Sequence, residues 1–237
     1  MISTKRIKER LKLLKGISIL KTLYFNFHYF RFSQAILLPV YLYNPQFIRL
    51  RGNVVLPSKI KSGMIVLGKH KVSIYPDTGI SLEINGTLEF KGYCTIGSGS
   101  FLSIHNSGHL KLGERCVITQ GIKIVCYKSI EFGKKVLCGW DCLVMDTDLH
   151  QLSDTQGVRV GNPCLPVRVG DESWISFQTT IMKGTIIPDR SVVASRSLCN
   201  KDYGATSYVL IAGTPAAILK KGIWRDPTND HVVYGKL

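Results

Sequence analysis

One short stretch of the chain, VMDTDLHQLSD at residues 144–154, places a histidine among three aspartates. The histidine is His150, and its acidic neighbours are Asp146, Asp148 and Asp154. An imidazole titrates near neutral pH and can take a proton from an attacking hydroxyl, while a carboxylate can orient the imidazole or hold a polar substrate. The alternative is a polar loop whose aspartates hydrogen-bond their own backbone in turns.

A period of six residues dominates the chain on both sides of this stretch. Aliphatic residues that end in one cysteine occupy every sixth position from 169 to 199, and a second such column runs from 112 to 142. A weaker column covers 84 to 102, and small hydroxyl residues keep the same period from 173 to 197. A helix repeats every 3.6 residues and a strand every two. A period of six predicts short strands joined by tight corners, as in a β-helix of hexapeptide repeats.

The rhythm breaks where His150 lies, because the spacing from Cys142 to Val169 is not a multiple of six. The segment between them is polar and contains glycine and proline, which favours a loop at 146–166 that leaves the coil and returns to it. A long loop on a regular scaffold is typical of a functional site.

The first 51 residues differ in charge from the rest of the chain. They contain ten Lys/Arg and a single acid, Glu9, within a chain whose net charge is +15. Ile7, Leu11 and Leu14 share one face of a predicted basic amphipathic helix, and an aromatic run follows it. Two interpretations remain open: a cap that closes the end of the β-helix, and a segment that docks on an anionic membrane. We expect no nucleic-acid partner.

The sequence also indicates whether the chain has membrane-spanning segments, signal segments or cysteine motifs. No apolar run approaches the ~18 residues of a transmembrane helix, and we expect no signal peptide. The seven cysteines are scattered and form no Cys-x2-Cys pair, so we expect reduced thiols, a cytoplasmic location and no metal requirement.

We divide the chain into a cap or docking segment (1–51), a β-helix domain (52–203) and a C-terminal tail (204–237).

Two segments carry a resemblance to a known family. VRVGDESWISFQTTIMKGTIIPDRSVVASRSLCNKD, at 167–202, and the tail IAGTPAAILKK are similar to the hexapeptide-repeat acyltransferases. The closest subgroup is the O-acetyltransferases of polysaccharide biosynthesis, similar to the galactoside enzymes. The resemblance implies an all-β fold, a left-handed parallel β-helix with an N-terminal helical cap and a short C-terminal extension. It also implies a homotrimer with active sites between subunits, and acetyl-CoA as co-substrate. The docking interpretation of residues 1–51, which comes from their charge and pattern, would place the protein peripherally on the inner face of the membrane.

The resemblance also implies site residues. His150 would be the general base that deprotonates a sugar or glycan hydroxyl in cell-surface polysaccharide biosynthesis, and Asp146 and Asp148 would bind the acceptor or orient His150. A backbone N–H at a coil corner, at Ser176, would meet the charge on the thioester oxygen. The residues expected to line the CoA groove are Ser176, Ser195, Arg196, Asn200, Lys201 and Lys220.

This sequence departs from the family pattern at Ser176 and Arg196, where the family has glycine. Arg196 would contact a CoA phosphate or block the usual path of the cofactor. Three alternative functions stay open. They are an N-acyltransferase on an amino-nucleotide-sugar, a non-catalytic module that binds glycan or membrane, and a zinc hydratase with His105, His109 and His150 as ligands.

Overall fold

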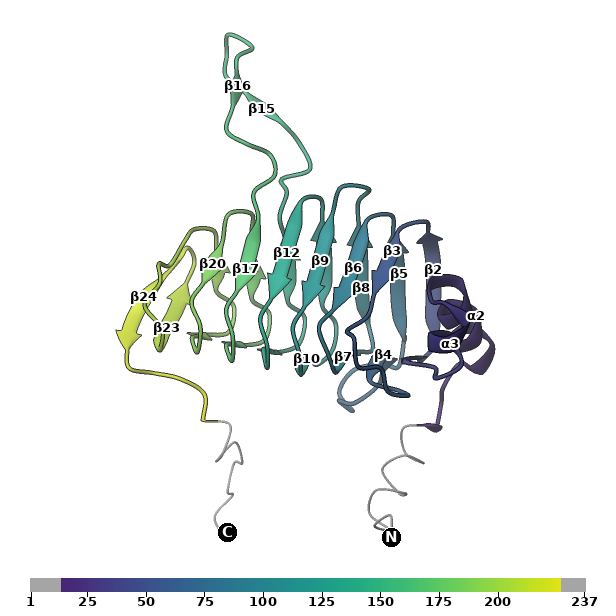
Figure 1. The fold of residues 1–237 in the computed structure, drawn as a ribbon. Coiled ribbons are helices and arrows are strands. Elements are labelled where there is room, and N and C mark those ends of the chain that lie inside the picture. Colours follow the sequence, from purple (N-terminus) through teal and green to yellow (C-terminus); the bar gives the residue numbers. More distant parts are fainter. Residues whose placement is uncertain (1–13, 227–237) are drawn as a thin grey trace, which may run out of the picture.

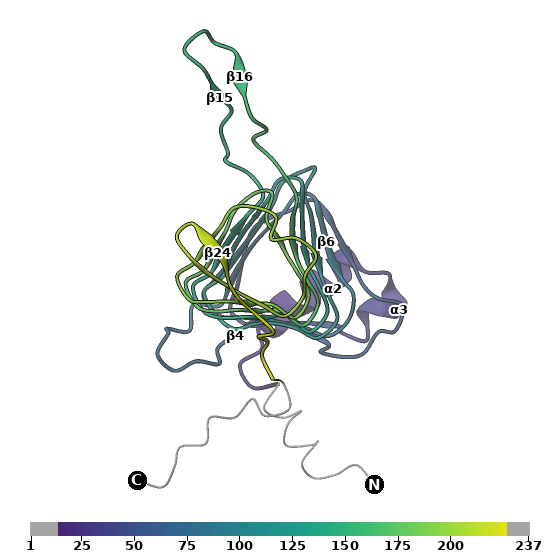
Figure 2. The ribbon, with the colours of Figure 1, turned by 90° about the vertical axis from the view of Figure 1, so that its left-hand side faces the viewer.

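The computed structural model describes residues 14–226, and they form a left-handed parallel β-helix with a triangular cross-section (Figures 1 and 2). The coils contribute short strands to three sheets, and the strands of successive coils pair in parallel within each sheet. The corners are named by the sheets they connect: corner 1–2, corner 2–3 and corner 3–1. This confirms the fold predicted from the period of six.

The strands of each sheet are given in spatial order. The first sheet contains β1 (Val40–Leu42), β4 (Ile65–Lys69), β7 (Cys94–Gly97), β10 (Cys116–Ile118), β13 (Leu137–Cys138), β18 (Trp174–Ile175), β21 (Val192–Val193), β23 (Val209–Gly213) and the antiparallel β24 (Ala216–Lys221). The second contains β2 (Pro45–Leu50), β5 (Ile80–Ile84), β8 (Ser100–Ile104), β11 (Lys123–Cys126), β14 (Leu143–Met145), β19 (Thr180–Ile181) and β22 (Leu198–Cys199). The third contains β20 (Ile186–Ile187), β17 (Val167–Val169), β12 (Ser129–Phe132), β9 (His109–Leu112), β6 (Thr87–Phe90) and β3 (Asn53–Val55).

The aliphatic columns of the sequence form the core. All residues of the column from Val169 to Cys199, and of the column from Leu112 to Cys142, are at most 1% exposed. Each inward side chain packs on its counterparts one coil away, because strands in a sheet lie only about 4.8 Å apart. The hydrophobic effect therefore acts along the whole axis of the coil.

The column of small hydroxyls is also buried, and its members satisfy backbone groups between coils. Ser173 donates its hydroxyl to the carbonyl of Pro188 at 2.9 Å and accepts from the N–H of Ser191 at 3.2 Å. Thr185 donates to the carbonyl of Cys199 at 3.0 Å. A larger side chain would not fit these tight corners, which explains why the sequence keeps serine and threonine there.

A helical cap closes the N-terminal end of the coil. Helix α2 (Ile19–Tyr29) and the short α3 (Phe32–Ala35) lie across the first coil, and Phe25 and Ala35 are fully buried against it. The sheets begin at Val40, so the boundary predicted between residues 51 and 52 falls inside the first coil, where β1 and β2 already pair with β4 and β5. The helix predicted from Ile7, Leu11 and Leu14 lies outside the described residues except at Leu14, which is exposed.

The C-terminal end of the β-helix is covered by a strand rather than by a helix. At the C-terminal end β24 folds back antiparallel on β23 and covers the last strand of the first sheet. Among residues 14–226, neither helix has the length and apolar character needed to cross a bilayer.

Candidate active site

The loop predicted at 146–166 protrudes from corner 2–3, between β14 and β17 (Figure 1). Its tip is a small antiparallel pair, β15 (Leu152–Ser153) and β16 (Arg159–Val160), whose residues are all exposed. The regular coil resumes at β17, which pairs with β12 as if the loop were absent. The break in the sequence period therefore marks an insertion into an intact coil.

The root of this loop is held by a buried carboxylate. Asp146 is fully buried, and its two oxygens accept the backbone N–H groups of Tyr127, Lys128 and Ser129, each at 2.7 Å. The predicted contact of Asp146 with the acceptor or with His150 is therefore wrong, because its oxygens face the preceding coil. Asp146 sets the direction in which the loop leaves.

The need for this carboxylate follows from the hydrogen bonds of the other coils. Two coils before Asp146, at the same corner, the N–H groups of His105 and His109 donate to the carbonyls of Cys126 and Lys128 on the next coil. The N–H groups of Tyr127, Lys128 and Ser129 would need carbonyl acceptors at the same corner of the next coil, but there the chain departs into the loop. The oxygens of Asp146 replace them, since an unpaired buried N–H destabilises the folded state.

An ion pair holds both arms of the loop close to the coil that follows it. Lys183 Nζ lies 2.5 Å from Asp148 Oδ2 and 2.5 Å from the carbonyl oxygen of Asn162, and the N–H of Asp148 donates to Pro163. Lys183 was not predicted as a site residue. Its position at corner 2–3 is visible only once the coils are stacked.

His150 lies on the outgoing arm of the loop, and it is exposed. Its imidazole makes no hydrogen bond or ion pair with any other residue in the part of the chain that the structure describes. The predicted contact with Asp148 is not formed within one chain, because that carboxylate pairs with Lys183. Both ring nitrogens are therefore available to a substrate or a neighbouring subunit.

Three of the residues predicted to bind CoA gather at corner 1–2. The hydroxyls of Ser176 and Ser195 are 2.7 Å apart on successive coils, and Arg196 follows directly with its Nε donating to Gln178 Oε1 at 2.8 Å. The N–H of Ser176 donates to the carbonyl of Val193. The prediction that this N–H stabilises a thioester oxygen is therefore wrong, because it belongs to the ladder between coils.

A mostly apolar hollow of about 260 Å³ lies beside these serines on the first sheet. Three of its lining residues are aromatic, and the ring centroids of Trp140 and Phe177 are 6.3 Å apart. Tyr75 packs edge-on against Trp140, and its hydroxyl donates to Asp141, which raises the pKa of Tyr75 to about 12. The residues lining the hollow are Thr119, Leu137, Gly139, Trp140, Trp174, Ser176 and Phe177. Sequence reasoning missed the aromatic ones, although Trp140 and Phe177 follow strand ends one coil apart.

The other predicted cofactor residues lie apart from this group. Asn200 and Lys201 are exposed at corner 2–3, on the coil that follows Lys183, and Lys220 is exposed on β24 opposite Leu210. The second sheet lies between corner 1–2 and corner 2–3. One chain therefore brings Ser176, Ser195 and Arg196 together but keeps them on a different corner from His150.

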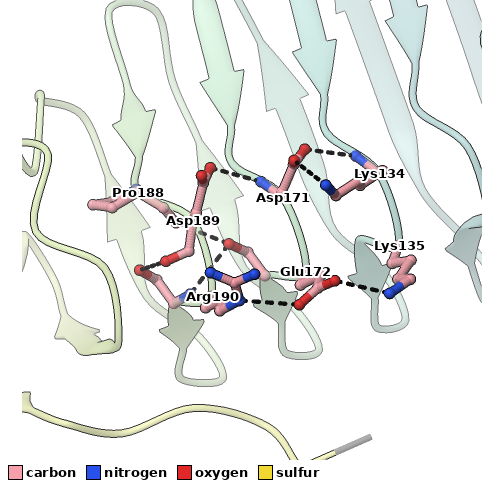
Figure 3. Close-up of polar contacts among 9 residues, drawn as sticks. Lys134, Lys135, Asp171, Glu172, Pro188, Asp189 and Arg190 are labelled. Carbon is pink, nitrogen blue, oxygen red and sulfur yellow. Dashed lines mark hydrogen bonds and ion pairs between the residues drawn. The ribbon is translucent and has the colours of Figure 1, made fainter.

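Corner 3–1 carries a surface network of charges rather than a loop (Figure 3). Glu172 lies between Lys135 and Arg190, at 2.9 and 3.0 Å, and these two cations lower the pKa of its carboxyl. Asp171 and Asp189 add links between successive coils, the N–H of Asp171 donating to Asp189 at 2.9 Å. This corner braces the coils from outside.

The histidines needed by a zinc site face other groups. His105 stacks on Tyr127 with ring centroids 4.5 Å apart, and His109 Nε2 lies 2.9 Å from Glu89 Oε2. Within residues 14–226, no cluster of three or more His, Cys, Asp or Glu side chains is arranged to hold a metal ion.

Comparison with known proteins identifies relatives of the chain. It is 29% identical over 183 residues to "Probable acetyltransferase Rv3034c" of Mycobacterium tuberculosis, which covers 72% of this chain and 54% of the relative. It is 24% identical over 147 residues to "Putative lipopolysaccharide biosynthesis O-acetyl transferase WbbJ" of Escherichia coli, covering 58% of this chain and 73% of the relative. The chain thus spans about half the length of the first of these relatives.

Solved structures support the fold. The polySia-specific acetyltransferase NeuO superposes with a TM-score of 0.57 at 19% identity, over 79% of this chain and 74% of that one. No protein-family model matches the sequence. The predicted resemblance to the hexapeptide-repeat acetyltransferases is confirmed. It now rests on similarity to named acetyltransferases in sequence and on the β-helix in structure.

Proposed function

We propose that this protein is an acetyl-CoA-dependent O-acetyltransferase that acetylates a sugar hydroxyl in the biosynthesis of a bacterial cell-surface polysaccharide. One observation carries the proposal: His150 is exposed and has no polar partner among residues 14–226, on a loop whose root is fixed by Asp146 and Lys183. The names of the relatives support both the acyl group and the class of acceptor.

The proposed chemistry is direct transfer. The imidazole of His150 takes the proton of the acceptor hydroxyl as that oxygen attacks the thioester carbonyl of acetyl-CoA. The tetrahedral intermediate collapses with cleavage of the C–S bond, and the CoA thiolate receives the proton from the imidazolium. No acyl-enzyme forms, and the scheme requires no metal.

Acetyl-CoA would lie along corner 1–2 and the aromatic hollow beside it. The hollow offers apolar surface for the uncharged part of the molecule, and Arg196 is a cation suited to a phosphate. Asn200, Lys201 and Lys220 stay in the proposal as more distant contacts, with the two lysines as partners for phosphates.

A homotrimer would complete this site. In one chain His150 and the serine pair lie on different corners, so the CoA groove of one subunit must face the loop of another. The exposed apolar residues of the loop, Leu149, Leu152, Val158 and Val160, are between 50% and 61% exposed and would pack on that neighbour. The unpaired cysteines of the described residues fit a cytoplasmic location.

The test is thiol release from acetyl-CoA across a panel of mono- and oligosaccharides, including amino sugars. His150→Ala should lower kcat about 10²- to 10⁴-fold while acetyl-CoA still binds. His105→Ala is the matched control, since His105 is also an exposed histidine at corner 2–3 and should leave kcat unchanged. Equal activity of wild type and His150→Ala would exclude this base. A preference for amines would move the reaction to N-acylation.

A further inference from the structure

Helix α2 carries large apolar side chains on the face that is turned away from the coil. Its inner face buries Thr22, Phe25 and Asn26 on the first coil. Asn26 is held there, because its side-chain amide donates to the carbonyl of Val40 at 2.8 Å. A surface helix normally places polar residues on the side away from the core. The outer face of α2 departs from that rule.

The outer face of α2 and the segment around α3 form one apolar surface, which we call the cap patch. Its members are between 46% and 81% exposed, and Phe27 and Phe32 connect the two elements with ring centroids 6.0 Å apart. The cap patch consists of Ile19, Leu20, Tyr24, Phe27, Phe32 and Ile36. So many exposed large apolar residues at one end of a protein mark a contact surface.

The segment of the chain that carries the cap patch has charges of one sign. Residues 14–76 contain nine Lys/Arg and no Asp or Glu. Arg31, Arg49 and Arg51 are exposed, and none forms an ion pair with another described residue. The partner of this surface must therefore combine an apolar region that can bury these side chains with negative charge.

We propose that the cap patch docks on the surface of an anionic lipid bilayer. Leu20 and Phe32, the most exposed members, would enter the boundary between headgroups and acyl chains, and the arginines would meet lipid phosphates. A second copy of the chain fits less well. Contact between two such patches would bring together two copies of a basic segment, residues 14–76, that contains no acid of its own.

Docking through the cap would set the position of the loop. The second sheet runs from β2 through β5, β8 and β11 to β14, and strand spacings of about 4.8 Å place the root of the loop roughly 19 Å from β2, the strand of this sheet nearest the cap, along the coil axis. The loop projects sideways from that axis (Figures 1 and 2). This step rests on the proposed function: it would bring His150 to sugars joined to a membrane lipid. The lipid contact itself does not rest on it.

Vesicle co-sedimentation of the full chain tests the proposal, with phosphatidylcholine vesicles that either contain or lack phosphatidylglycerol. The wild type should bind only the anionic vesicles, less well at high salt. Leu20→Ser with Phe32→Ser, and separately Arg31→Gln with Arg49→Gln, should each weaken binding about tenfold or more. Leu219→Ser and Lys123→Gln are matched controls, being an exposed leucine and an exposed lysine outside the cap, and should bind like wild type.

The remaining outcomes are also decisive. Absence of vesicle binding by a folded wild type would overturn the proposal, as would equal binding by cap and control variants. Smaller oligomers in the Leu20→Ser/Phe32→Ser variant, with no vesicle binding by the wild type, would assign the patch to a second copy. His150→Ala should bind vesicles normally, and the cap variants should keep thiol release with soluble sugars. Loss of transfer and loss of docking are therefore distinguishable.

Discussion

Corner 2–3 and corner 3–1 solve the same problem, linking successive coils, with carboxylates in opposite surroundings. At corner 3–1 Glu172 remains near the surface and pairs with two side-chain cations. At corner 2–3 Asp146 is fully buried and accepts three backbone N–H groups. The difference teaches that a regular corner needs only surface bracing. A corner that opens for a long insertion needs a buried group that replaces the missing carbonyls.

Substitution of Asp146 should have the largest effect. Asp146→Ala leaves three backbone donors at the loop root without an acceptor, so the free energy of unfolding should fall by about 3 kcal/mol or more. Urea denaturation measures it. Asp154→Ala is the control, because Asp154 also accepts backbone N–H groups but in an exposed local turn, and should cost about 0.5 kcal/mol. Equal losses would remove the distinction between the two kinds of corner.

Substitution of Lys183 should affect catalysis more than stability. Lys183→Ala frees both arms of the loop, and kcat should fall about tenfold with little change in KM, since a small misplacement of the base slows transfer. Lys183→Arg should restore much of kcat, because it keeps the charge against Asp148. If Lys183→Arg is as slow as alanine, or if only KM changes, the loop does not depend on this ion pair.

Substitution of Arg196 tests whether corner 1–2 binds acetyl-CoA, whereas the substitution of Lys183 tests how corner 2–3 positions the base. If Arg196 meets a CoA phosphate, Arg196→Gln should raise the KM for acetyl-CoA about tenfold and leave kcat near wild type. Arg196→Lys, which keeps the charge, should lie between the two. A lower KM in Arg196→Gln would show instead that the arginine blocks the path of the cofactor.

The smallest effect is expected at Glu172. Its folded-state pKa is lowered by Lys135 and Arg190, so its contribution to stability is present above its ordinary pKa of 4.5 and is lost as the pH falls through the lowered value. Glu172→Gln should therefore cost about 0.5 kcal/mol at neutral pH and nothing in strong acid, since both cations that pair with Glu172 are exposed and solvent screens the interaction. Denaturation midpoints across acidic pH measure it. A loss that persists in acid would point to packing instead.

The sequence by itself determined the coil, because its period is local. Successive sixth residues point inward from the three sheets in turn, and each meets its counterpart one coil further on, as Ile175 meets Val193. The columns ending at Cys142 and Cys199 therefore predicted both the architecture and the core. The same period located the insertion that carries His150. An interruption of the six-residue period therefore predicts an insertion as directly as the period predicts the coil.

Only the tertiary structure decided what the polar residues do, since that depends on neighbours far along the chain. Asp146 and Asp148 look alike in the sequence, yet one is buried under the N–H groups of the preceding coil and the other meets Lys183 on the following coil. The N–H of Ser176 belongs to the ladder, and α2 closes the coil with one face while exposing the other. Which donors lose their partners, and which apolar face lacks a cover, is settled only when the coils are stacked.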